Sequence, residues 1–538
     1  MNENHILVGK FIRDFKQYEN LPGYVDRLQR ELALIDLHKL TPMFVQVQDI
    51  IKLIPDIPHN IRGSAGSSLV CFLLGISHID PIAWGIGLTR FIHELRKDMP
   101  DIDIDVPWNL RDDVWTRVFS RYGDRALRVS NKIGWKTKSI KQEFLRRQKR
   151  DPSVLYEQVE DELLGAQRAW SVHCGGVVIF DASVNDGKGA PDDIVLRPYQ
   201  LNLDKNDVEA RGLYKIDILS SRALGQLAEI SSRPLFDYPA EDSRTEALWT
   251  GDVVHCASAP GVGVTGGESP AFRKAVMGIE AKTRQDIMLA SALIRPAAAS
   301  GLKKAECLEQ YRKNRTMDNL VYDDDCIRVI SERLRVSEAE ADLIRRKIVK
   351  GKIEVPDNLK DVAEFTAYSF CKSHAIAYGA VVWALSYWKA RDPQKFWTSA
   401  LNNCMSMYRK WVHVREAIRC GVPSHHIDPQ LSLFRPSGSD QARVKGFWTG
   451  DELPGMVDEK RDDAFKFKGL IAASRVYKPK EHQPMTFVTI WTGQYRQLVL
   501  KGMVDVSKSV WIEGLGKYEV VQNADHIAVR DFRLTDSW

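Results

Sequence analysis

The sequence has no long apolar run, no paired cysteines and little excess charge of either sign, and each absence excludes a class of protein. No segment reaches the ~18 uncharged apolar residues of a membrane-spanning helix, so we expect no membrane partner. The N-terminal segment MNENHILVGKFIRDFK lacks an uninterrupted apolar core followed by small residues and does not predict a secretory signal. The eight cysteines are scattered without a CxxC pair, which argues against a disulfide scaffold or a zinc ribbon and favours the reducing cytoplasm.

The remaining composition is that of a globular protein with several domains. At roughly 150 residues per domain, the 538 residues make three or four domains. A hydrophobic fraction of 44% and a charged fraction of 27% exclude wholesale disorder. The net charge of +5 is too small to identify a partner, so the local distribution of charge is more informative.

Basic residues are concentrated between Arg121 and Arg150, where eleven lysines and arginines stand against two acids. Two interpretations remain open. The segment is either a solvated helical face or a surface that follows a phosphate backbone, and like charges at this density repel one another unless an anion neutralises them. Trp135, inside the segment, can stack on a ligand or pack in a core.

The spacing of apolar residues divides the chain into helical and strand-forming regions. Residues 20–55 have helical spacing, and residues 61–76 begin as a Gly/Ser loop and continue as an apolar helix. After the Gly-rich segment APGVGVTGGESP, about 140 residues are mostly helical, and the last 75 or so alternate with a period of two, which predicts a small β-barrel. Separate strands are predicted in residues 100–106, 172–180 and 210–219.

The sequence PDIDID, residues 100–105, contains the sharpest local signal. Alternate side chains of a strand share a face, so Asp101, Asp103 and Asp105 project together while two isoleucines anchor the other face. Three adjacent carboxylates repel one another unless cations neutralise them, which indicates Mg²⁺. An EF-hand calcium loop is excluded, because its sixth and twelfth positions here are not Gly and Glu. An acidic strand end exposed to water remains the alternative for this motif taken alone.

Two further segments favour a metal site that handles phosphates. RGSAGSS, residues 62–68, precedes a helix; small residues let backbone N–H groups approach a phosphate, and a helix N-terminus adds favourable partial charge. In the KID motif, Lys215 and Asp217 are two residues apart in an apolar strand and therefore share a face. A third carboxylate beside a cation suits a metal site that receives a triphosphate.

The order of these segments resembles that of the bacterial family C replicative polymerases, the family of the DNA polymerase III alpha subunit. The resemblance is carried first by RGSAGSSLVCFLLGISHIDPIAWGIGLTRFIHELRKDMPDIDID. It continues through HCGGVVIF, GLYKIDIL, LIRP, EADLIRRKIVKGK and FTAYSFCKSHAIAYGAVVWALSYWKA, covering roughly residues 20–405 and, more faintly, the C-terminal barrel. Six motifs in the family's order are a specific signal.

The resemblance implies an α+β multidomain polymerase. It would contain a polymerase-β-like nucleotidyltransferase palm, a short inserted thumb, helical fingers and a C-terminal OB-type (oligonucleotide-binding) β-barrel. We expect the palm in residues 1–115 and 169–225, the thumb in 116–168, the fingers in 226–425, a linker with a candidate clamp-binding motif in 426–462, and the barrel in 463–538.

The resemblance also assigns roles to individual residues. The family's metal-binding aspartates match Asp101, Asp103 and Asp217, which implies two Mg²⁺ ions and two-metal phosphoryl transfer. Asp105 matches an acidic position that usually lies outside the metal triad. The residues expected around the incoming nucleotide are Gly63, Ser64, Arg90, Lys215, Arg345 and Arg346. The implied activity is template-directed addition of dNTPs to a primer 3′ end, with primer–template DNA as the second partner.

The sequence departs from the family pattern in ways that predict a compact enzyme. The palm-like region starts almost at the N-terminus, so we expect no PHP domain, and without another exonuclease motif we expect no proofreading. IRGS replaces GRGS, GVTGGES (263–269) replaces GVFQxES, and RPAA (295–298) replaces RPGP. We expect a bacterial cytoplasmic protein of phage, mobile-element or minor cellular origin. The alternative is a lesion-tolerant or catalytically inactive DNA-binding relative that acts as a replication accessory factor, although an inactive relative should have lost part of the Asp101, Asp103, Lys215 and Asp217 set.

Two surfaces are candidates for DNA and for a sliding clamp. The candidate duplex-binding residues are Arg146, Arg147 and Arg150. QLSLF, residues 430–434, resembles the pentapeptide by which bacterial polymerases dock into the clamp, with apolar groups for a pocket and a glutamine for hydrogen bonds. The candidate clamp-binding residues are Gln430, Leu431, Leu433 and Phe434. An ordinary packed strand is an equally open interpretation of this segment.

Three further features keep two interpretations each. His173 in HCGG is either a packed core histidine or a functional one. The CKSH residues (Lys372, Ser373 and His374) either cap the fingers or contact substrate. The barrel is either a platform for a single strand or a packing module; its candidate contacts are Lys478, Lys480, Trp491 and Arg496.

Overall fold

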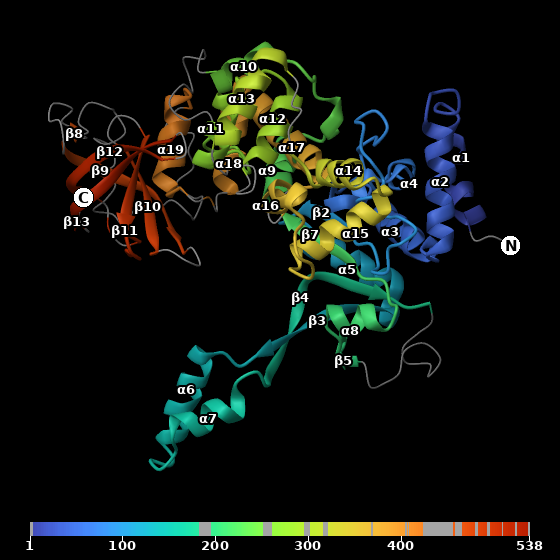
Figure 1. The fold of residues 1–538 in the computed structure, drawn as a ribbon, viewed down its shortest axis with the longest axis horizontal. Helices are drawn as coiled ribbons and strands as arrows, with labels where there is room; N and C mark the ends of the chain where they lie inside the picture. The colour runs from blue at the N-terminus through green and yellow to red at the C-terminus, as the bar shows by residue number, and fades with distance from the viewer. Residues whose placement is uncertain are drawn as a thin grey trace. The chain divides into compact units, whose positions relative to one another are not determined.

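The computed structural model forms two compact units. The N-terminal unit comprises Met1–Ser221 and Ser337–Leu343, and the C-terminal unit comprises Arg222–Val336 and Ile344–Trp538. The structure describes residues 4–181, 195–250, 261–294, 302–315, 321–366, 370–403, 406, 408–422, 456–457, 465–478, 483–491, 495–507, 509, 511–521 and 524–535. Figure 1 shows the helices and strands within each unit. No described helix combines the length and apolar character needed to cross a membrane.

Three helices open the N-terminal unit and confirm the helical spacing of residues 20–55. They are α1 (Asn4–Phe15), α2 (Tyr24–Leu37) and α3 (Thr41–Leu53). Their apolar stripes are buried, with Ile35, Phe44 and Val47 fully inaccessible. The expected loop-to-helix segment follows as β1 (Asn60–Arg62), the 3₁₀ helix η1 (Gly63–Ser67) and α4 (Leu69–Leu73).

The N-terminal unit is built around one seven-stranded sheet in the order β1-β2-β7-β4-β3-β6-β5. The two central strands β2 (Ile102–Pro107) and β7 (Ile216–Ser221) are parallel, and β7 is antiparallel to β4 (Gln167–Ile179). The predicted strands at 100–106, 172–180 and 210–219 are therefore confirmed, although β7 begins only at Ile216 and extends two residues past the last segment. The other elements are β3 (Ala126–Gly134), β5 (Val195–Arg197), β6 (Gln200–Leu201), α5 (Arg111–Tyr122), η2 (Gly123–Arg125) and α8 (Lys205–Ala210).

A helical hairpin sits at the far end of the long β3–β4 ribbon, as Figure 1 shows. It consists of α6 (Thr137–Gln148) and α7 (Tyr156–Leu163) and has a small core of Ile140, Val159 and Leu163. This hairpin is shorter than the segment 116–168 expected for a thumb. The difference arises because α5 precedes the ribbon and the first residues of β3 pair with Val177–Ile179 of β4 inside the sheet.

The C-terminal unit confirms the mostly helical region. Its central helix is α17 (Lys372–Arg391), which is buried on almost every side. A Cβ added to Gly379 would lie 2.6 Å from the Cα of Met288, so α17 and α12 touch backbone to backbone there. The surrounding helices are α9 (Arg222–Ile230), η4 (Leu235–Asp237), α10 (Ser243–Thr250), α11 (Pro270–Ile279), α12 (Arg284–Leu293), α13 (Leu302–Asn314), α14 (Asp323–Leu334), η6 (Asp357–Leu359), α16 (Lys360–Thr366), α18 (Pro393–Asn402) and α19 (Lys410–Arg419). Helix α15 (Glu338–Val349) begins in the N-terminal unit and ends in the C-terminal unit.

The last strands close into a five-stranded barrel, which confirms the barrel predicted from the alternating pattern. The strand order β10-β11-β13-β12-β9 closes through an additional β10–β9 pairing, and the short β8 extends the sheet beyond β9. The strands are β8 (Met456–Val457), β9 (Phe465–Tyr477), β10 (Met485–Trp491), β11 (Tyr495–Lys501), β12 (Trp511–Val521) and β13 (Ala524–Thr535). Inward-facing Ile471, Val488 and Leu498 fill the interior. The RPAA and QLSLF segments lie outside the described residues.

Candidate active site

The parallel pairing of β2 and β7 brings two of the predicted catalytic carboxylates together. Asp103 and Asp217 are direct partners in the register. The residues on either side, Ile102, Ile104 and their partners on β7, are fully or almost fully buried on the opposite face. Because side chains alternate along a strand, both carboxylates therefore project from the same face of the sheet. Asp101 directly precedes β2 and has a largely exposed side chain.

Lys215 links the carboxylates. Its ammonium group is paired with Asp217 and lies 3.5 Å from Oδ1 of Asp101. Burial acts to lower the pKa of Lys215, but the charges of Asp217 and Asp101 outweigh it and raise the pKa, so the lysine stays protonated. The shared face predicted for Lys215 and Asp217 is consistent with this contact.

Asp103 is held in an unfavourable electrostatic environment. Burial, followed by the charges of Asp217 and Asp101, raises its pKa to about 7. Oδ1 of Asp103 and Oδ1 of Asp217 are both buried and accept no hydrogen bond. Two buried carboxylate oxygens that lack partners are a donor set suited to a hard divalent cation.

Within the described part of the chain, no three His, Cys, Asp or Glu side chains are already arranged closely enough to hold a metal ion. Instead, Lys215 lies among the carboxylates and pairs with Asp101 and Asp217. The Asp101 side chain is largely exposed and is therefore the least constrained of the three carboxylates. The residues therefore fit a divalent cation, with Asp103 and Asp217 as the fixed donors and Asp101 as the adjustable one.

The HCGG segment forms a bulge beside the carboxylates. On β3 one residue separates Arg128 and Ser130, whereas on β4 four residues separate their partners Val177 and Val172. The extra residues turn the ring of His173 so that its Nδ1 accepts hydrogen bonds from the N–H groups of Gly176 (2.8 Å) and Gly175 (3.3 Å). A bulge of this kind redirects a side chain.

The ring of His173 therefore lies beside one of the candidate metal ligands. Its Nδ1 lies 3.5 Å from Oδ1 of Asp217. Burial lowers the pKa of His173, which keeps the ring neutral. Glycine is required at the bulge, since a Cβ at Gly175 would lie 2.6 Å from Leu219 and one at Gly176 would lie 2.9 Å from His173. The Gly-Gly pair is the sequence signal for the kink, but nothing in the sequence indicates where the ring points.

The predicted phosphate loop lies next to the carboxylates. Gly63 has a φ of +73°, which favours glycine, and a Cβ there would lie 3.8 Å from Oδ2 of Asp103. Ser64 follows in η1, and its carbonyl accepts a hydrogen bond from the hydroxyl of Ser67 at 2.5 Å. The loop is thus stabilised by a hydrogen bond within it, and it lies close to the candidate metal ligand Asp103.

A buried glutamate that the sequence analysis missed supports this loop. Glu31 on α2 accepts hydrogen bonds from the hydroxyl of Ser68 and from the N–H groups of Leu69 (2.9 Å) and Val70 (3.1 Å). Burial raises the pKa of Glu31, while Arg27, 3.6 Å away, and these hydrogen bonds act in the opposite direction. The available signal was a charged residue on the apolar stripe of a helix.

Asp105 is held away from the metal-binding role by an arginine. Arg62 on β1 donates two hydrogen bonds to the carboxylate of Asp105, at 3.0 and 2.9 Å. This bidentate pair is consistent with the expectation that Asp105 lies outside the metal triad. In the sequence, Arg62 is marked only as the first residue of the Gly/Ser loop.

For the remaining predicted nucleotide-binding residues, the structure shows how far each side chain is buried and, for Arg345, an ion-pair partner. Arg90 is half-buried in the N-terminal unit. In the C-terminal unit, Arg345 is buried, 3.5 Å from Asp323, and Arg346 is half-buried. Arg345 would have to exchange Asp323 for a phosphate before it could bind a nucleotide. In the CKSH segment, the N–H of Lys372 donates to Asp324 at the start of α17, Ser373 is buried and the ring of His374 packs on Phe370.

The basic hairpin and the barrel present part of the predicted DNA-binding surface. Arg146 is paired with Glu143, Arg147 with Glu143 (3.1 Å) and Glu162 (2.6 Å), and Arg150 is exposed. Trp135 packs against the hairpin core, with Arg168 stacked over its ring at 5.0 Å. On the barrel, Lys478 is exposed and Arg496 is half-buried; Lys480, the Trp491 side chain and the clamp candidates are outside the described residues.

Comparison with known proteins agrees with the resemblance carried by the motifs. Residues 7–158 match the family model described as the bacterial DNA polymerase III alpha NTPase domain. The chain is 25% identical to the error-prone DNA polymerase of Corynebacterium efficiens, over 82% of this chain and 48% of the relative. It is 27% identical to the DNA polymerase III subunit alpha of Thermotoga maritima, over 69% and 46%, and 25% identical to error-prone DNA polymerase 2 of Rhizobium meliloti, over 85% and 51%.

The chain thus spans about half the length of the curated relatives it matches. With up to 85% of this chain covered, the matches extend well beyond the residues of the family model. The chain is therefore similar to the bacterial family C DNA polymerases and resembles their DNA polymerase III alpha subunit.

Proposed function

We propose that this protein is a template-directed DNA polymerase that adds dNTPs to a primer 3′ end with the help of two Mg²⁺ ions. The observation that carries the proposal is the register pair Asp103 and Asp217, whose buried Oδ1 atoms lack hydrogen-bond partners beside a Gly/Ser loop. The sheet and the α6–α7 hairpin would act as palm and thumb, the helical region as fingers and the barrel as an OB-type module. The relatives' names, DNA polymerase III alpha and error-prone DNA polymerase, support the same function.

The chain's own residues would hold, orient and neutralise the reactants. Asp101, Asp103 and Asp217 would bind the metal ions, which when bound supply Lewis acidity and charge neutralisation for phosphoryl transfer. The backbone of the loop at Gly63 and Ser64 would contact the triphosphate. Lys215, released from Asp101 and Asp217, would place its positive charge on the same phosphates. Arg62 keeps the Asp105 carboxylate occupied, so that it does not compete for the metal.

Primer–template DNA and dNTPs are the proposed partners. The arginines of the α6–α7 hairpin would contact the duplex backbone, with Arg146 and Arg147 exchanging their carboxylate partners for phosphates. A sliding clamp remains a proposed partner through Gln430, Leu431, Leu433 and Phe434. Its test is the product length with and without clamp for the wild type and the Leu433→Ala/Phe434→Ala variant, with loss of stimulation expected in the variant.

Primer extension tests the proposal directly. The wild-type chain should extend a primer with four dNTPs and Mg²⁺, and Asp103→Asn or Asp217→Asn should reduce the rate by at least about 10³-fold, since each removes a proposed metal ligand. Asp113→Asn, an exposed acid on α5, is the matched control. A wild-type rate in Asp103→Asn would show that the metal assignment is wrong. The same assay with a labelled mismatched 3′ end tests the proposed lack of proofreading, because no excision product is expected.

A lesion-tolerant polymerase is the second candidate function. It is favoured by the names of two of the relatives described above, which are error-prone DNA polymerases. A catalytically inactive accessory factor is less well supported, because the Asp101, Asp103, Lys215 and Asp217 set is intact and contiguous in space. Extension past an abasic template site, at a rate within about tenfold of that on an undamaged template, would identify the lesion-tolerant function.

A further inference from the structure

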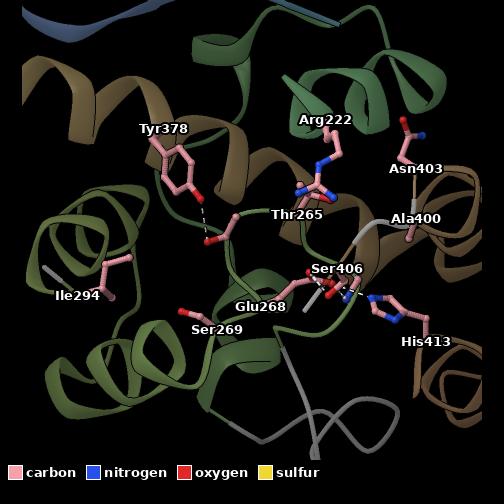
Figure 2. A pocket seen from close by; sticks show the side chains of 12 residues that line it. Arg222, Thr265, Glu268, Ser269, Ile294, Tyr378, Ala400, Asn403, Ser406 and His413 are labelled. Atoms are coloured by element: carbon pink, nitrogen blue, oxygen red, sulfur yellow. Dashed lines mark hydrogen bonds and ion pairs between the residues drawn. The ribbon is translucent and has the colours of Figure 1, made fainter. Parts of the chain in front are cut away.

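A cavity with a mixed polar and apolar lining lies within the C-terminal unit and is not part of the carboxylate site. It has a volume of about 310 Å³ and is lined by the GVTGGES loop, by the start of α9 and by α17 and α19. Figure 2 shows Arg222 pointing from the start of α9 toward Thr265, with Glu268, Ser269 and Tyr378 around the same hollow. Arg222 follows Asp217 by only five positions in the sequence.

The loop that forms the cavity has a rigid, glycine-dependent shape. A Cβ on Gly263 (φ +83°) would lie 2.7 Å from Trp397, and one on Gly266 (φ +96°) would lie 2.7 Å from the hydroxyl of Tyr378. That hydroxyl donates to the carbonyl of Gly266 at 3.1 Å, and Gln226 of α9 donates to the carbonyl of Gly263 at 2.7 Å. The loop is thus held at Gly263 and at Gly266 by side chains from α9 and α17.

The hollow coincides with the two positions at which this chain departs from the GVFQxES pattern. Thr265 stands where that pattern has phenylalanine, and Gly266 stands where it has glutamine. Both replacements are smaller, so they leave space between Arg222 and Tyr378 that larger side chains would reduce. A phenylalanine at position 265 would therefore be expected to fill part of this cavity.

The lining has a defined chemistry. Glu268 is already bound by three donors, namely Nε2 of His413 (2.8 Å), the hydroxyl of Ser406 (2.5 Å) and the N–H of Gly263 (2.9 Å). Its carboxylate is thus satisfied within the protein and opposes an anion less than a bare carboxylate would. The guanidinium of Arg222 suits a phosphate, because it offers donors in a planar fork. The ring of Tyr378 and the side chain of Ile294 suit a flat base.

We propose that this cavity binds a nucleoside monophosphate unit, with Arg222 on the phosphate and the base beside Tyr378. The volume is at the lower end of the range for small-molecule sites and exceeds what a lone phosphate needs. The choice of nucleotide chemistry rests on the proposed polymerase function. Two sources present the same unit, an unpaired nucleotide of single-stranded DNA and a free nucleotide.

Binding is best measured without catalysis. The probes are 2-aminopurine deoxyriboside monophosphate and a short oligothymidylate containing one 2-aminopurine, each titrated by fluorescence with full-length Asp103→Asn protein in EDTA. Thr265→Phe fills the cavity with the side chain of the related pattern and should weaken binding at least about tenfold. Arg222→Gln should weaken the monophosphate about fivefold or more but leave the uncharged deoxyriboside little changed. Met277→Phe, at an exposed position on α11 in the same unit, should have no effect.

The outcomes separate cleanly. The proposal is supported if the wild-type cavity binds either probe and Thr265→Phe loses that binding. Binding of the oligothymidylate would identify single-stranded DNA as the ligand, and binding of the monophosphate would identify a free nucleotide. Binding that is unchanged in Thr265→Phe, no binding of either probe, or competition by inorganic phosphate as strong as by the monophosphate overturns it. If Thr265→Phe fails to fold by circular dichroism, the Arg222→Gln comparison between monophosphate and deoxyriboside decides. Primer extension by the wild type is scored separately, so a protein that extends primers without binding the probes refutes only this inference.

Discussion

Nδ1 of His173 lies 3.5 Å from Oδ1 of Asp217, and neither atom donates a proton to the other. The imidazole nitrogen accepts from the N–H groups of Gly175 and Gly176, which assigns the proton of the neutral ring to Nε2. The carboxylate oxygen has no hydrogen-bond partner although it is buried. The position of this oxygen is therefore set by the packing of the bulge and by the ion pair that the other oxygen of Asp217 makes with Lys215.

Gly176→Ala should impair catalysis more than folding. The added Cβ would lie 2.9 Å from Nδ1 of His173 and 3.2 Å from Oδ1 of Asp217, so both groups must move by a few tenths of an ångström. Displacements of this order at a reacting site cost about tenfold or more in rate. Primer extension and melting temperature should be compared with those of Gly87→Ala, whose Cβ meets nothing within 4 Å. Equal rates in the two variants would exclude a positioning role for the bulge.

Glu31→Ala should destabilise the protein and loosen the Gly/Ser loop. It removes the acceptor of three hydrogen bonds and leaves two buried backbone N–H groups without a partner, at a cost of about 2–4 kcal/mol. The KM for dNTPs should rise more than kcat falls, because the loop is the proposed triphosphate contact. Thermal denaturation and steady-state kinetics measure the two effects, with Glu19→Ala, an exposed acid nearby in the sequence, as the control. An unchanged melting temperature would show that the hydrogen bonds of Glu31 do not stabilise the loop.

The acids of the α6–α7 hairpin should weaken its binding to DNA. Glu143→Gln frees Arg146 and Arg147 from one competing carboxylate and should strengthen binding to any duplex sequence. Replacing Arg146, Arg147 and Arg150 by glutamine should weaken binding and reduce the slope of log K against log salt by about 0.9 for each phosphate that the protein no longer neutralises. Fluorescence anisotropy over a salt series measures both. A slope that the triple variant leaves unchanged would put the duplex elsewhere.

His59 should make the protein less stable as the pH falls below 6.5. Burial, followed by the neighbouring His78, lowers the pKa of His59 to about 3, and the two rings are 4.7 Å apart. Between pH 6.5 and 3 the unfolded chain binds a proton that the folded chain does not, so stability is lost as the pH decreases. The loss between pH 6.5 and 5 is up to about 2 kcal/mol, and His59→Gln should remove it.

Melting temperatures at pH 7.5 and 5.0 for the wild type and His59→Gln measure this contribution. His78→Gln should also reduce the wild type's pH dependence, because it removes the second cause of the lowered pKa of His59. Identical shifts between the two pH values in wild type and His59→Gln would contradict the assignment.

Local patterns predicted the elements of the site better than its contacts. The alternation in PDIDID and the spacing of Lys215 and Asp217 were sufficient to predict which side chains share a face, because strand geometry alone determines this. The pairing of Asp105 with Arg62 was not predictable, since it depends on the antiparallel register of β1 and β2. The Gly-Gly pair is a local sequence signal for the kink in β4, whereas the direction of the His173 ring depends on how many residues the bulge contains.

On the surface and in the fold as well, local patterns were predictable and contacts between distant segments were not. The pairs of Glu143 with Arg146 and Arg147 follow from helical spacing, but the Glu162 contact requires the α6–α7 hairpin to fold back. Alternation predicted a barrel, while its closure depends on the pairing of β9 with β10. The helical hairpin itself was not predicted, because α5 and β3 carry no local mark of the element they join.

The β4 bulge also has a mechanical consequence. From Gln167 to His173 the strand spans about 20 Å, and it joins the α6–α7 hairpin to the residues beside Asp217 without an intervening loop. We expect the ribbon to bend at HCGG, because the extra residues there already interrupt the hydrogen-bond ladder between β3 and β4. If duplex DNA bound to the hairpin and displaced it, the displacement would be transmitted along β4 to the Asp103 and Asp217 pair. Binding of the product duplex and the geometry of the carboxylates would then be coupled through this one strand.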